Sequence, residues 1–462
     1  MERFDISELK DGANIHFIGI GGVSMSGLAH IALGHGFKVT GSDWEEKPVT
    51  KKLEEMGADI VYGHGAVNED GIKSANLVVY TAAAKGDNPE IILSKAENKR
   101  IIDRAEFLGA VMKNYTHAVG VAGTHGKTTT TSMLAHALIY AELDPTISVG
   151  GDLDLIGGNI RAGGRDYFVT EACEYTNSFL KFYPTIALIT NIEADHLDFF
   201  SGIDEIIESF KKYAELTRGI GKVVAIGGDE NVQKALDGTG LDVITYGMTD
   251  EFDYYPKNIA YHKGLPAFDV CRGGETVCRL QLKVPGEHNV LNTLATVAVC
   301  DILGVDAEVA ARGIETFSGV HRRFENKGHV NGAMVIDDYA HHPTEIKATL
   351  KAARAFPHNK IRCIFQPHTY SRTKTLWDEF LYAFDECDEL ILTHIYPARE
   401  VFDGVTKSEN LTAEIAARGI NAKYIDEFSD IVTYIKENAQ EGDIIFTMGA
   451  GDVTNIGAEL TK

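Results

Sequence analysis

The stretch GVAGTHGKTTTT, residues 120–131, decides the fold of the middle of the chain. It continues an apolar run, HAVGVAG, and leads into KTTTTSMLAHALIYAEL, which is typical of a helix. A glycine-rich turn between a strand and a helix presents backbone N–H groups and a helix N-terminus to an anion. Lys127 and Thr128 open the helix, at the positions from which a P-loop contacts the phosphates and Mg²⁺ of ATP. The stretch therefore predicts an ATP loop within an α/β domain.

The spacing of this loop is irregular. The usual G-x-x-x-x-G-K-[ST] pattern has its first glycine where this chain has Val121. A glycine- and threonine-rich turn with an unrelated lysine is the alternative interpretation. The strand before and the helix after favour the ATP loop. The residues expected to surround the nucleotide are Gly123, Thr124, Gly126, Lys127, Thr128 and Thr129.

A second glycine-rich turn, GIGGVSMSG at residues 19–27, follows the apolar run IHFIGI. The third glycine of the dinucleotide fingerprint is replaced by Ser24, while Asp43 ends a second strand, where such enzymes place their ribose-binding acid. The loop could hold NAD, the diphosphate of another nucleotide such as a sugar nucleotide, or no ligand if its glycines only pack a helix. The candidate ligand-binding residues are Gly19, Gly21, Gly22, Ser24 and Asp43.

Composition limits the partners. Lys and Arg number 44 against 67 Asp and Glu, and the net charge of −23 argues against nucleic acid or an anionic membrane as a partner. The N-terminus lacks a basic region followed by an apolar one, and no apolar run approaches the length of a membrane span. The six cysteines include no C-x-x-C pair, which is typical of reduced thiols. We expect a cytoplasmic enzyme without membrane insertion.

The length of 462 residues predicts about three domains, at roughly 100–200 residues each. Apolar runs alternate with amphipathic stretches, which predicts α/β domains with parallel sheets. We expect a Rossmann-like domain at residues 1–113, a central P-loop domain at 114–318 and a third Rossmann-like domain at 319–462. Alternation between Asp253 and Pro285 predicts a small antiparallel subsheet in the central domain.

Six motifs in chain order resemble the Mur ligases: GTHGKTTTT, NIEADHLDFF, GEHNVLNTLA, HRRFE, DDYAHHPTE and QPHTYSRT. The resemblance spans essentially the whole chain. The N-terminal HFIGIGGVSMSG is similar to the family member that joins L-alanine to UDP-N-acetylmuramate for peptidoglycan synthesis. The resemblance implies that the first glycine-rich turn holds the UDP diphosphate and the second holds ATP. It also implies an acyl-phosphate intermediate and release of ADP and phosphate.

The resemblance implies a Mg²⁺ site beside the ATP loop. Lys127 and two Mg²⁺ ions would bring the substrate carboxylate and the γ-phosphate together, since both are anions. The implied metal ligands are Thr128, Glu171 at the end of YFVTEA, and His196 after IALITNI. Mg²⁺ prefers oxygen, so a lone histidine would otherwise be interpreted as a structural loop residue.

Glu174 completes an E-x-x-E pattern that begins at Glu171. Relatives more commonly have acids where this chain has Cys173 and Asn177. We therefore expect Glu174 either to face the substrate or to lie in solvent.

The second half of the chain supplies the expected contacts to the rest of ATP. An asparagine can both donate to and accept from an adenine edge, although Asn289 could equally cap a helix. The resemblance implies adenine contacts from His288, Asn289 and Asn292, a ribose contact from Asp338, and a γ-phosphate contact from Arg323 or, alternatively, Arg322.

The incoming alanine is expected to meet the third domain. By resemblance, Arg372 anchors its carboxylate, while Tyr339 and His341 face the place where the substrates join. Many relatives have arginine where this chain has Thr369, so the pocket can differ in detail. Arg399 is a further anion-contact candidate. Ligands divided among three domains predict a closing motion.

Three alternatives remain open from the sequence. A related ligase that reattaches a recovered tripeptide to UDP-N-acetylmuramate shares nearly every motif. An NAD(P)-dependent oxidoreductase would use the first loop and leave the second without a role. A non-catalytic ATP-binding module would not account for the acidic and histidine residues at the strand ends. The sequence is compatible with a monomer or a homodimer.

Overall fold

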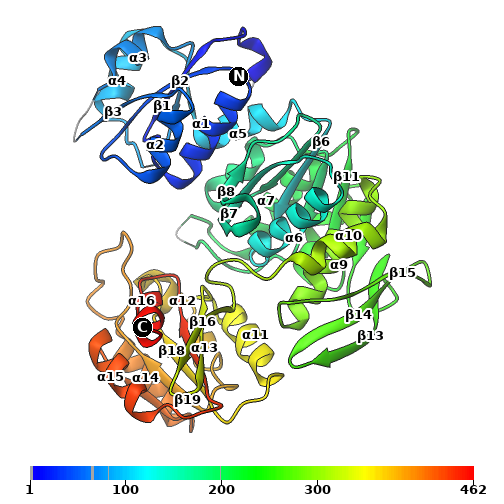
Figure 1. Ribbon diagram of the computed structural model, residues 1–462, viewed down its shortest axis with the longest axis vertical. Coiled ribbons are helices and arrows are strands. Elements are labelled where there is room, and N and C mark those ends of the chain that lie inside the picture. The colour runs from blue at the N-terminus through cyan, green and yellow to red at the C-terminus, as the bar shows by residue number, and fades with distance from the viewer. Residues whose placement is uncertain (1–3, 64–66, 82, 198) are drawn as a thin grey trace. The chain divides into compact units, whose positions relative to one another are not determined.

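The computed structural model describes residues 4–63, 67–81, 83–197 and 199–462, and Asp198 of the NIEADHLDFF motif lies outside this description. The described residues form three sheets in an α/β fold of three domains, as predicted (Figure 1). The chain divides into two compact units, Met1–Tyr246 with Ala295–Ala310 and Gly247–Leu294 with Ala311–Lys462. The domain boundaries at residues 113 and 318 stay a prediction. Within the described ranges, no helix has the length and apolar character needed to cross a bilayer.

The N-terminal sheet is parallel, in the order β3-β2-β1-β4-β5. Its strands are β1 (Asn14–Ile18), β2 (Lys38–Asp43), β3 (Asp59–Tyr62), β4 (Leu77–Tyr80) and β5 (Ile101–Asp103). Its helices are α1 (Val23–Gly34), α2 (Pro48–Glu55), α3 (Glu69–Ser74), α4 (Pro89–Ala96) and α5 (Arg104–Met112). The strand order reverses between β1 and β4. Ligands bind open α/β sheets at such a point. The first glycine-rich turn follows β1 and therefore lies beside this point.

The central sheet of the first unit runs in the order β12-β11-β10-β6-β9-β7-β8. Its strands are β6 (His117–Ala122), β7 (Thr146–Leu153), β8 (Gly158–Arg161), β9 (Tyr167–Glu171), β10 (Ile186–Ile189), β11 (Lys222–Ile226) and β12 (Val243–Tyr246). Its helices are α6 (Lys127–Tyr140), α7 (Ile203–Glu215) and α8 (Glu230–Leu236). The antiparallel β7–β8 pair was not predicted. The carboxyl ends of β9, β6 and β10 lie side by side and carry the motif residues.

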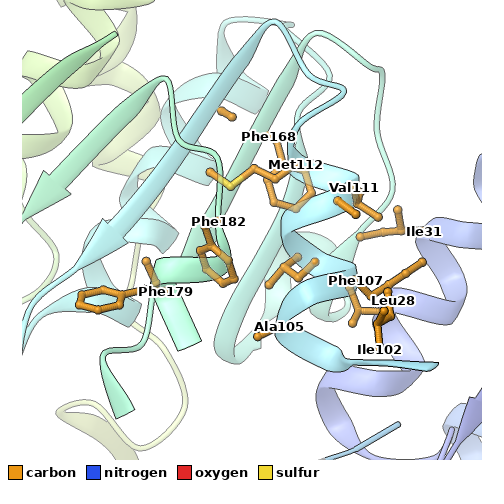
Figure 2. Packing of buried hydrophobic residues seen from close by; sticks show 14 of the residues in the cluster. Leu28, Ile31, Ile102, Ala105, Phe107, Val111, Met112, Phe168, Phe179 and Phe182 are labelled. Carbon is orange, nitrogen blue, oxygen red and sulfur yellow. The ribbon is translucent and has the colours of Figure 1, made fainter. Parts of the chain in front are cut away.

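Helix α5 joins the first two sheets into one unit. Phe107 and Val111 of α5 lie beside Leu28 and Ile31 of α1, while Met112 lies beside Phe168 of β9 (Figure 2). Gly27 allows α1 to lie close against β8, because a Cβ at this position would lie 1.6 Å from Cδ1 of Ile160. The two domains therefore share one buried apolar cluster.

The second unit begins with the predicted antiparallel subsheet, β13 (Tyr254–His262), β14 (Leu265–Arg272) and β15 (Glu275–Gln281), which is confirmed. Helices α9 (Glu287–Ile302) and α10 (Ala307–Thr316) belong partly to each unit.

The C-terminal sheet has the order β16-β17-β21-β18-β19-β20, with only β16 antiparallel to its neighbour among the described strands. Its strands are β16 (Glu325–Val330), β17 (Ala333–Asp338), β18 (Ile361–Phe365), β19 (Glu389–Leu392), β20 (Ala422–Tyr424) and β21 (Ile444–Met448). Its helices are α11 (Pro343–Arg354), α12 (Tyr370–Thr375), α13 (Trp377–Phe380), α14 (Ser408–Ala417), α15 (Phe428–Asn438) and α16 (Thr454–Leu460). Pro343 starts α11, as expected for a residue that lacks an N–H and has a helical φ.

Candidate active site

The ATP loop lies between β6 and α6, and two of its glycines are required by its geometry. Gly126 caps α6 with φ 84°, and Gly123 has φ 142°. A Cβ on Gly123 would lie 1.9 Å from Oγ1 of Thr190. Gly120 instead lies inside β6, where its carbonyl accepts a 2.8 Å hydrogen bond from the hydroxyl of Tyr213. Gly120 therefore serves packing, which accounts for the irregular spacing of glycines.

Lys127 opens α6 and folds back over the loop. Its Nζ donates to the carbonyls of Gly123 and Thr124 and lies 3.0 Å from Oε2 of Glu174. Burial disfavours the ammonium charge, but the Glu174 carboxylate outweighs it and leaves the pKa of Lys127 raised above its ordinary value. The loop thus carries a permanent cation. Glu174 is 3% exposed, so it belongs to the site and does not lie in solvent.

Three more motif residues lie at the carboxyl ends of neighbouring strands, which run in the order β10-β6-β9. Glu171 is the last residue of β9 and accepts a hydrogen bond from the backbone N–H of Gly150. His196 follows β10, with Nε2 3.9 Å from Oε1 of Glu174. Thr128 is the second residue of α6, beside Lys127. The structure thus collects Glu171, His196 and the ATP loop at one edge of the sheet.

The residues at this edge fit a Mg²⁺ ion. Thr128 and Glu171 offer the oxygen ligands that Mg²⁺ prefers, and both are only partly buried. The Glu171 carboxylate occupies space left by the missing side chain of Gly150, since its oxygens lie 2.7 and 2.9 Å from where a Cβ would stand. A glycine at position 150 therefore preserves room for a carboxylate at the edge. The ligand roles of Thr128, Glu171 and His196 stay predictions.

Several backbone N–H groups of the first glycine-rich turn donate hydrogen bonds to residues at the end of β2. The N–H groups of Gly19 and Ile20 donate to the carbonyl of Ser42, at 2.9 Å each. Gly21 N–H donates to Oδ2 of Asp43 at 2.7 Å. Asp43 therefore ties the loop to the end of β2.

An anion at this turn would meet the start of α1. Gly22 is the N-cap of α1 and provides no side-chain cap, so the first-turn N–H groups, including that of Ser24, are not satisfied by a capping side chain. Such N–H groups and the helix dipole attract phosphate. The predicted residues Gly19, Gly21, Gly22, Ser24 and Asp43 lie together, and their ligand contacts stay predictions.

The expected adenine residues lie in the second unit, at the start of α9. Asn289 and Asn292 are buried and one turn apart, and Nδ2 of Asn292 donates to Oδ1 of Asn289 at 3.1 Å. Nδ2 of Asn289 donates to the carbonyl of Pro285 at 2.7 Å. His288 is exposed beside them. The two asparagines stabilise each other's orientation at the helix start.

The structure separates the two arginines of the HRRFE motif. Arg322 donates to the carbonyls of Gly449 and Gly451, at 2.7 and 2.9 Å, and its Nε lies 3.4 Å from Asp337. Arg323 is one-third exposed and lies 3.7 Å from Glu345. Arg322 therefore anchors the loop after β21, whereas Arg323 is more loosely held. This difference favours Arg323 as the arginine that contacts a phosphate.

Asp338 ends β17 and is 5% exposed. Its two oxygens accept hydrogen bonds from the N–H groups of Phe324 and Ala340, at 2.9 and 2.8 Å. Burial raises the pKa of Asp338 to about 6, although Arg323 opposes the rise. The carboxyl group thus holds the chain near Arg323, and its expected contact to ribose stays a prediction.

Arg372 lies in a cluster that includes a histidine not singled out from the sequence. Its Nη1 donates to Nδ1 of His368 at 3.0 Å, and the ring of His368 contacts the ring of His341 edge-on at 5.7 Å. The ring of Tyr339 packs against His341. His368 lies four residues before Arg372, just after β18, and this spacing was the signal that could have identified it.

Thr369 is the N-cap of α12, in the same segment. Its hydroxyl accepts a hydrogen bond from the N–H of Arg372, and φ is 65°. A threonine here thus caps the short helix that carries Arg372. Arg399 is exposed in the segment after β19.

Comparisons with known proteins show the family of the chain. Three family models match in chain order: the Mur ligase family, catalytic domain, at residues 14–116; the Mur ligase middle domain at 121–300; and the Mur ligase, glutamate ligase domain, at 322–451. A UDP-N-acetylmuramate–L-alanine ligase of Clostridium botulinum (strain Kyoto / Type A2) is 50% identical over 97% of this chain and 98% of its own. One from Clostridium perfringens (strain 13 / Type A) is 48% identical over 99% and 100%.

Solved structures are also similar. A UDP-N-acetylmuramate–alanine ligase of Thermotoga maritima aligns with a TM-score of 0.77 and 31% identity, covering 97% of this chain and 98% of its own. A murein peptide ligase of Psychrobacter arcticus 273-4 aligns with a TM-score of 0.69 and 27% identity over the same shares. Since the matches extend over all three domains, the chain belongs to the Mur ligase family.

Proposed function

We propose that this chain joins L-alanine to the lactyl carboxylate of UDP-N-acetylmuramate at the expense of ATP, in the synthesis of peptidoglycan precursors. The observation that carries the proposal is the Lys127–Glu174 pair on the ATP loop, flanked by Glu171 and His196. Relatives that share about half of its residues bear this activity in their names. The cytoplasmic location is part of the proposal.

The chemistry needs a cation where two anions meet. A carboxylate oxygen of the sugar nucleotide attacks the γ-phosphorus of ATP, forming an acyl phosphate and breaking the bond to ADP. The amine of alanine then attacks the acyl carbon, loses a proton and displaces inorganic phosphate. Lys127 offsets the repulsion between carboxylate and γ-phosphate because its pKa is raised, so it stays charged at neutral pH. Thr128, Glu171 and His196 would hold Mg²⁺, two ions by family resemblance. The bound metal would neutralise negative charge on the phosphates.

The division between the two glycine-rich turns supports the substrate assignment. The N-terminus of α1 would hold the diphosphate of the sugar nucleotide, and the ATP loop would hold the phosphates that react. In the second unit, His288, Asn289 and Asn292 would bind adenine, Asp338 the ribose, and Arg323 the γ-phosphate. Arg372 would bind the carboxylate of alanine, with His341 and Tyr339 beside it.

The proposal is tested by measuring phosphate release with ATP, Mg²⁺, UDP-N-acetylmuramate and L-alanine, omitting each in turn. We expect release only when all four are present. Release with a tripeptide that begins with alanine, but not with alanine itself, would instead establish the recycling ligase. If neither alanine nor the tripeptide supports phosphate release, both ligase activities are excluded. NAD(P)H binding would then be measured by fluorescence.

A further inference from the structure

Two consecutive residues near the ATP loop have a backbone conformation that residues other than glycine rarely adopt. Thr176 has φ 54° and ψ 24°, and Asn177 has φ 56° and ψ 27°. In this left-handed region Cβ lies too close to the following carbonyl oxygen, and a β-branched residue such as threonine is especially disfavoured there. Strained conformations of this kind persist only where the surrounding structure enforces them, and they cluster at functional sites. Neighbouring groups must therefore hold this turn in place.

The strained turn carries a residue of the candidate active site. Glu174 is the N-cap of the short helical segment η3 (Tyr175–Lys181), and its carbonyl accepts a 2.8 Å hydrogen bond from the N–H of Asn177. Oε2 of Glu174 lies 3.0 Å from Nζ of Lys127, and Oε1 lies 3.9 Å from Nε2 of His196. A shift of the turn would thus move a carboxylate that lies between the lysine of the ATP loop and a predicted metal ligand.

Helix α7 supplies a group that holds the turn. Ser209 of α7 is 4% exposed, and its hydroxyl donates a hydrogen bond to Oδ1 of Asn177. Leaving a buried hydroxyl without an acceptor costs free energy, so the fold favours this bond. One helical turn later, the hydroxyl of Tyr213 donates to the carbonyl of Gly120 in β6, the strand that leads into the ATP loop. The same helix therefore holds both the strained turn and the strand before the ATP loop.

The chain after the turn is fixed by packing against the same helix. Phe179 is fully buried, and its N–H donates to the carbonyl of Cys173 at 3.2 Å. Its ring stacks on the ring of Tyr213, with 4.7 Å between centroids. Asn177 lies between these anchored residues, at the point where the tip of the turn is tied to α7.

We propose that Asn177 is a positioning residue, which accepts the hydrogen bond from Ser209 and thereby holds Glu174 beside Lys127 for the reaction. The inference rests on the proposed function, because it takes the ligase reaction as the one that this charge pair serves. Asparagine suits the position because it tolerates the left-handed backbone and its amide oxygen accepts from a hydroxyl. A charged group stabilises a transition state only while it is held in place. Loosening the turn should therefore slow the reaction without weakening the binding of the sugar nucleotide.

Two substitutions remove the bond from opposite ends. Asn177→Gly permits the left-handed backbone and removes the acceptor, and Ser209→Ala removes the donor. Each should lower kcat about tenfold, the effect of one hydrogen bond, and leave KM for UDP-N-acetylmuramate unchanged because the first glycine-rich turn is intact. The double variant should be no slower than either single variant, since both remove the same bond. Initial rates of phosphate release measure these constants.

A rescue and a matched control separate positioning from stability. Asn177→Asp keeps an acceptor oxygen and a residue type that tolerates this backbone, so it should restore most of kcat. Thr217→Val, just after α7, removes a hydroxyl that is also buried but donates to the carbonyl of Ala214 within the same helix. It should lower the thermal unfolding midpoint about as much as Ser209→Ala does, while leaving kcat unchanged.

The outcomes distinguish this inference from the proposed function. Unchanged kcat in Asn177→Gly, in a protein that otherwise turns over alanine, would overturn the role of Asn177 alone. Equal losses of kcat in Thr217→Val and Ser209→Ala would also overturn it, because lost stability would then explain both. A double variant much slower than either single variant would show that the two residues do not act through one bond. Absence of turnover in the unsubstituted protein would overturn the inference together with the proposed function.

Discussion

The two glycine-rich turns share a strand–loop–helix design but differ in what lies inside them. In the first, Asp43 and the carbonyl of Ser42 bind N–H groups of the loop, so a carboxylate closes the turn onto its own sheet. In the second, the ammonium of Lys127 donates to carbonyls of the loop and is paired with Glu174. The first turn is hydrogen-bonded to its own sheet and is followed by a helix whose N-terminus attracts anions. The second turn also contains the ammonium group of a lysine.

A phosphate-binding turn therefore does not by itself imply reaction. A turn that only binds needs N–H groups and a rigid frame. A turn that stabilises a developing charge also needs a positioned cation, because phosphoryl transfer brings anions together. The proposed division between a holding turn and a reacting turn can be examined by substitutions on each side.

The largest effect is expected from Lys127→Ala. Removing the cation of the second turn should lower kcat by about 10³-fold, as the loss of an electrostatic stabiliser does. Because Glu174 would remain buried without its partner, Lys127→Ala/Glu174→Gln separates the lost cation from lost stability, and both variants should be equally inactive. Lys212→Ala, on the exposed face of α7, is the control. Phosphate release measures all three, and a Lys127→Ala variant with near-normal kcat would contradict the role of the second turn.

The next effect is expected from Gly123→Ala. The new Cβ would overlap Oγ1 of Thr190, and φ of 142° is unfavourable for alanine, so the loop must shift. We expect kcat to fall by about 10²-fold, the scale of a displaced catalytic group. Gly157→Ala also changes a glycine with positive φ, but nothing lies within 4 Å of its Cβ position, so only local strain is added. Equal activities of the two variants would show that the loop tolerates displacement.

Much of the fold could be predicted because local patterns and tertiary structure agree. Asp43 was expected to end a second strand and is the last residue of β2. The alternation between Asp253 and Pro285 predicted an antiparallel subsheet, which is β13–β15. The β7–β8 pair could not be predicted, because β8 has only four residues and its pairing depends on contacts with α1 through Gly27 and Ile160.

A smaller effect is expected in the first turn from Asp43→Ala. Losing the acceptor for Gly21 N–H should loosen the turn and raise KM for UDP-N-acetylmuramate about tenfold, the cost of about one charge-assisted hydrogen bond. KM for ATP should stay unchanged, because the second turn is intact. Initial rates with each substrate varied in turn measure both constants. An equal rise in both would show that the turns do not have separate roles.

The candidate site was only partly readable from sequence, for a physical reason. From the sequence, Glu171 and His196 were expected at the ends of two strands of one sheet. The structure confirms these positions but does not test the metal-ligand roles. The sequence could not distinguish Arg322 from Arg323, because the difference depends on the carbonyls of residues more than 100 positions away. His368 was also missed: its spacing of four residues from Arg372 was visible in the sequence, but its contact with His341 was not, because that contact joins segments that follow two different strands.

The smallest effect concerns Glu90, which is buried in the N-terminal domain. Its Oε1 accepts a hydrogen bond from the N–H of Asn68, and its Oε2 accepts one from the hydroxyl of Ser42. Burial would raise the pKa of Glu90, but hydrogen bonds from His16, Ser42 and Asn68 outweigh it and leave the pKa below its ordinary value. A lowered folded-state pKa stabilises the fold above the unfolded-state pKa of about 4.3, and this contribution is lost on acidification below it.

Glu90→Gln should therefore lower the thermal unfolding midpoint at pH 7, by an amount equivalent to about 1–3 kcal/mol, with a smaller difference from the unsubstituted protein at pH 4. Glu69→Gln, at an exposed pair with Lys73, should leave the thermal unfolding midpoint unchanged at either pH. A Glu90→Gln deficit that grows on acidification would show that the sign of the linkage is wrong.

The most direct measurement follows one oxygen atom between the two turns. UDP-N-acetylmuramate labelled with ¹⁸O in its lactyl carboxylate would be turned over with ATP, Mg²⁺ and L-alanine, and the released phosphate analysed by mass spectrometry. If the sugar nucleotide in the first turn is phosphorylated by ATP in the second, the phosphate carries one ¹⁸O from the carboxylate. Phosphate released without the label would contradict the account, because the carboxylate would not have been joined to the γ-phosphate.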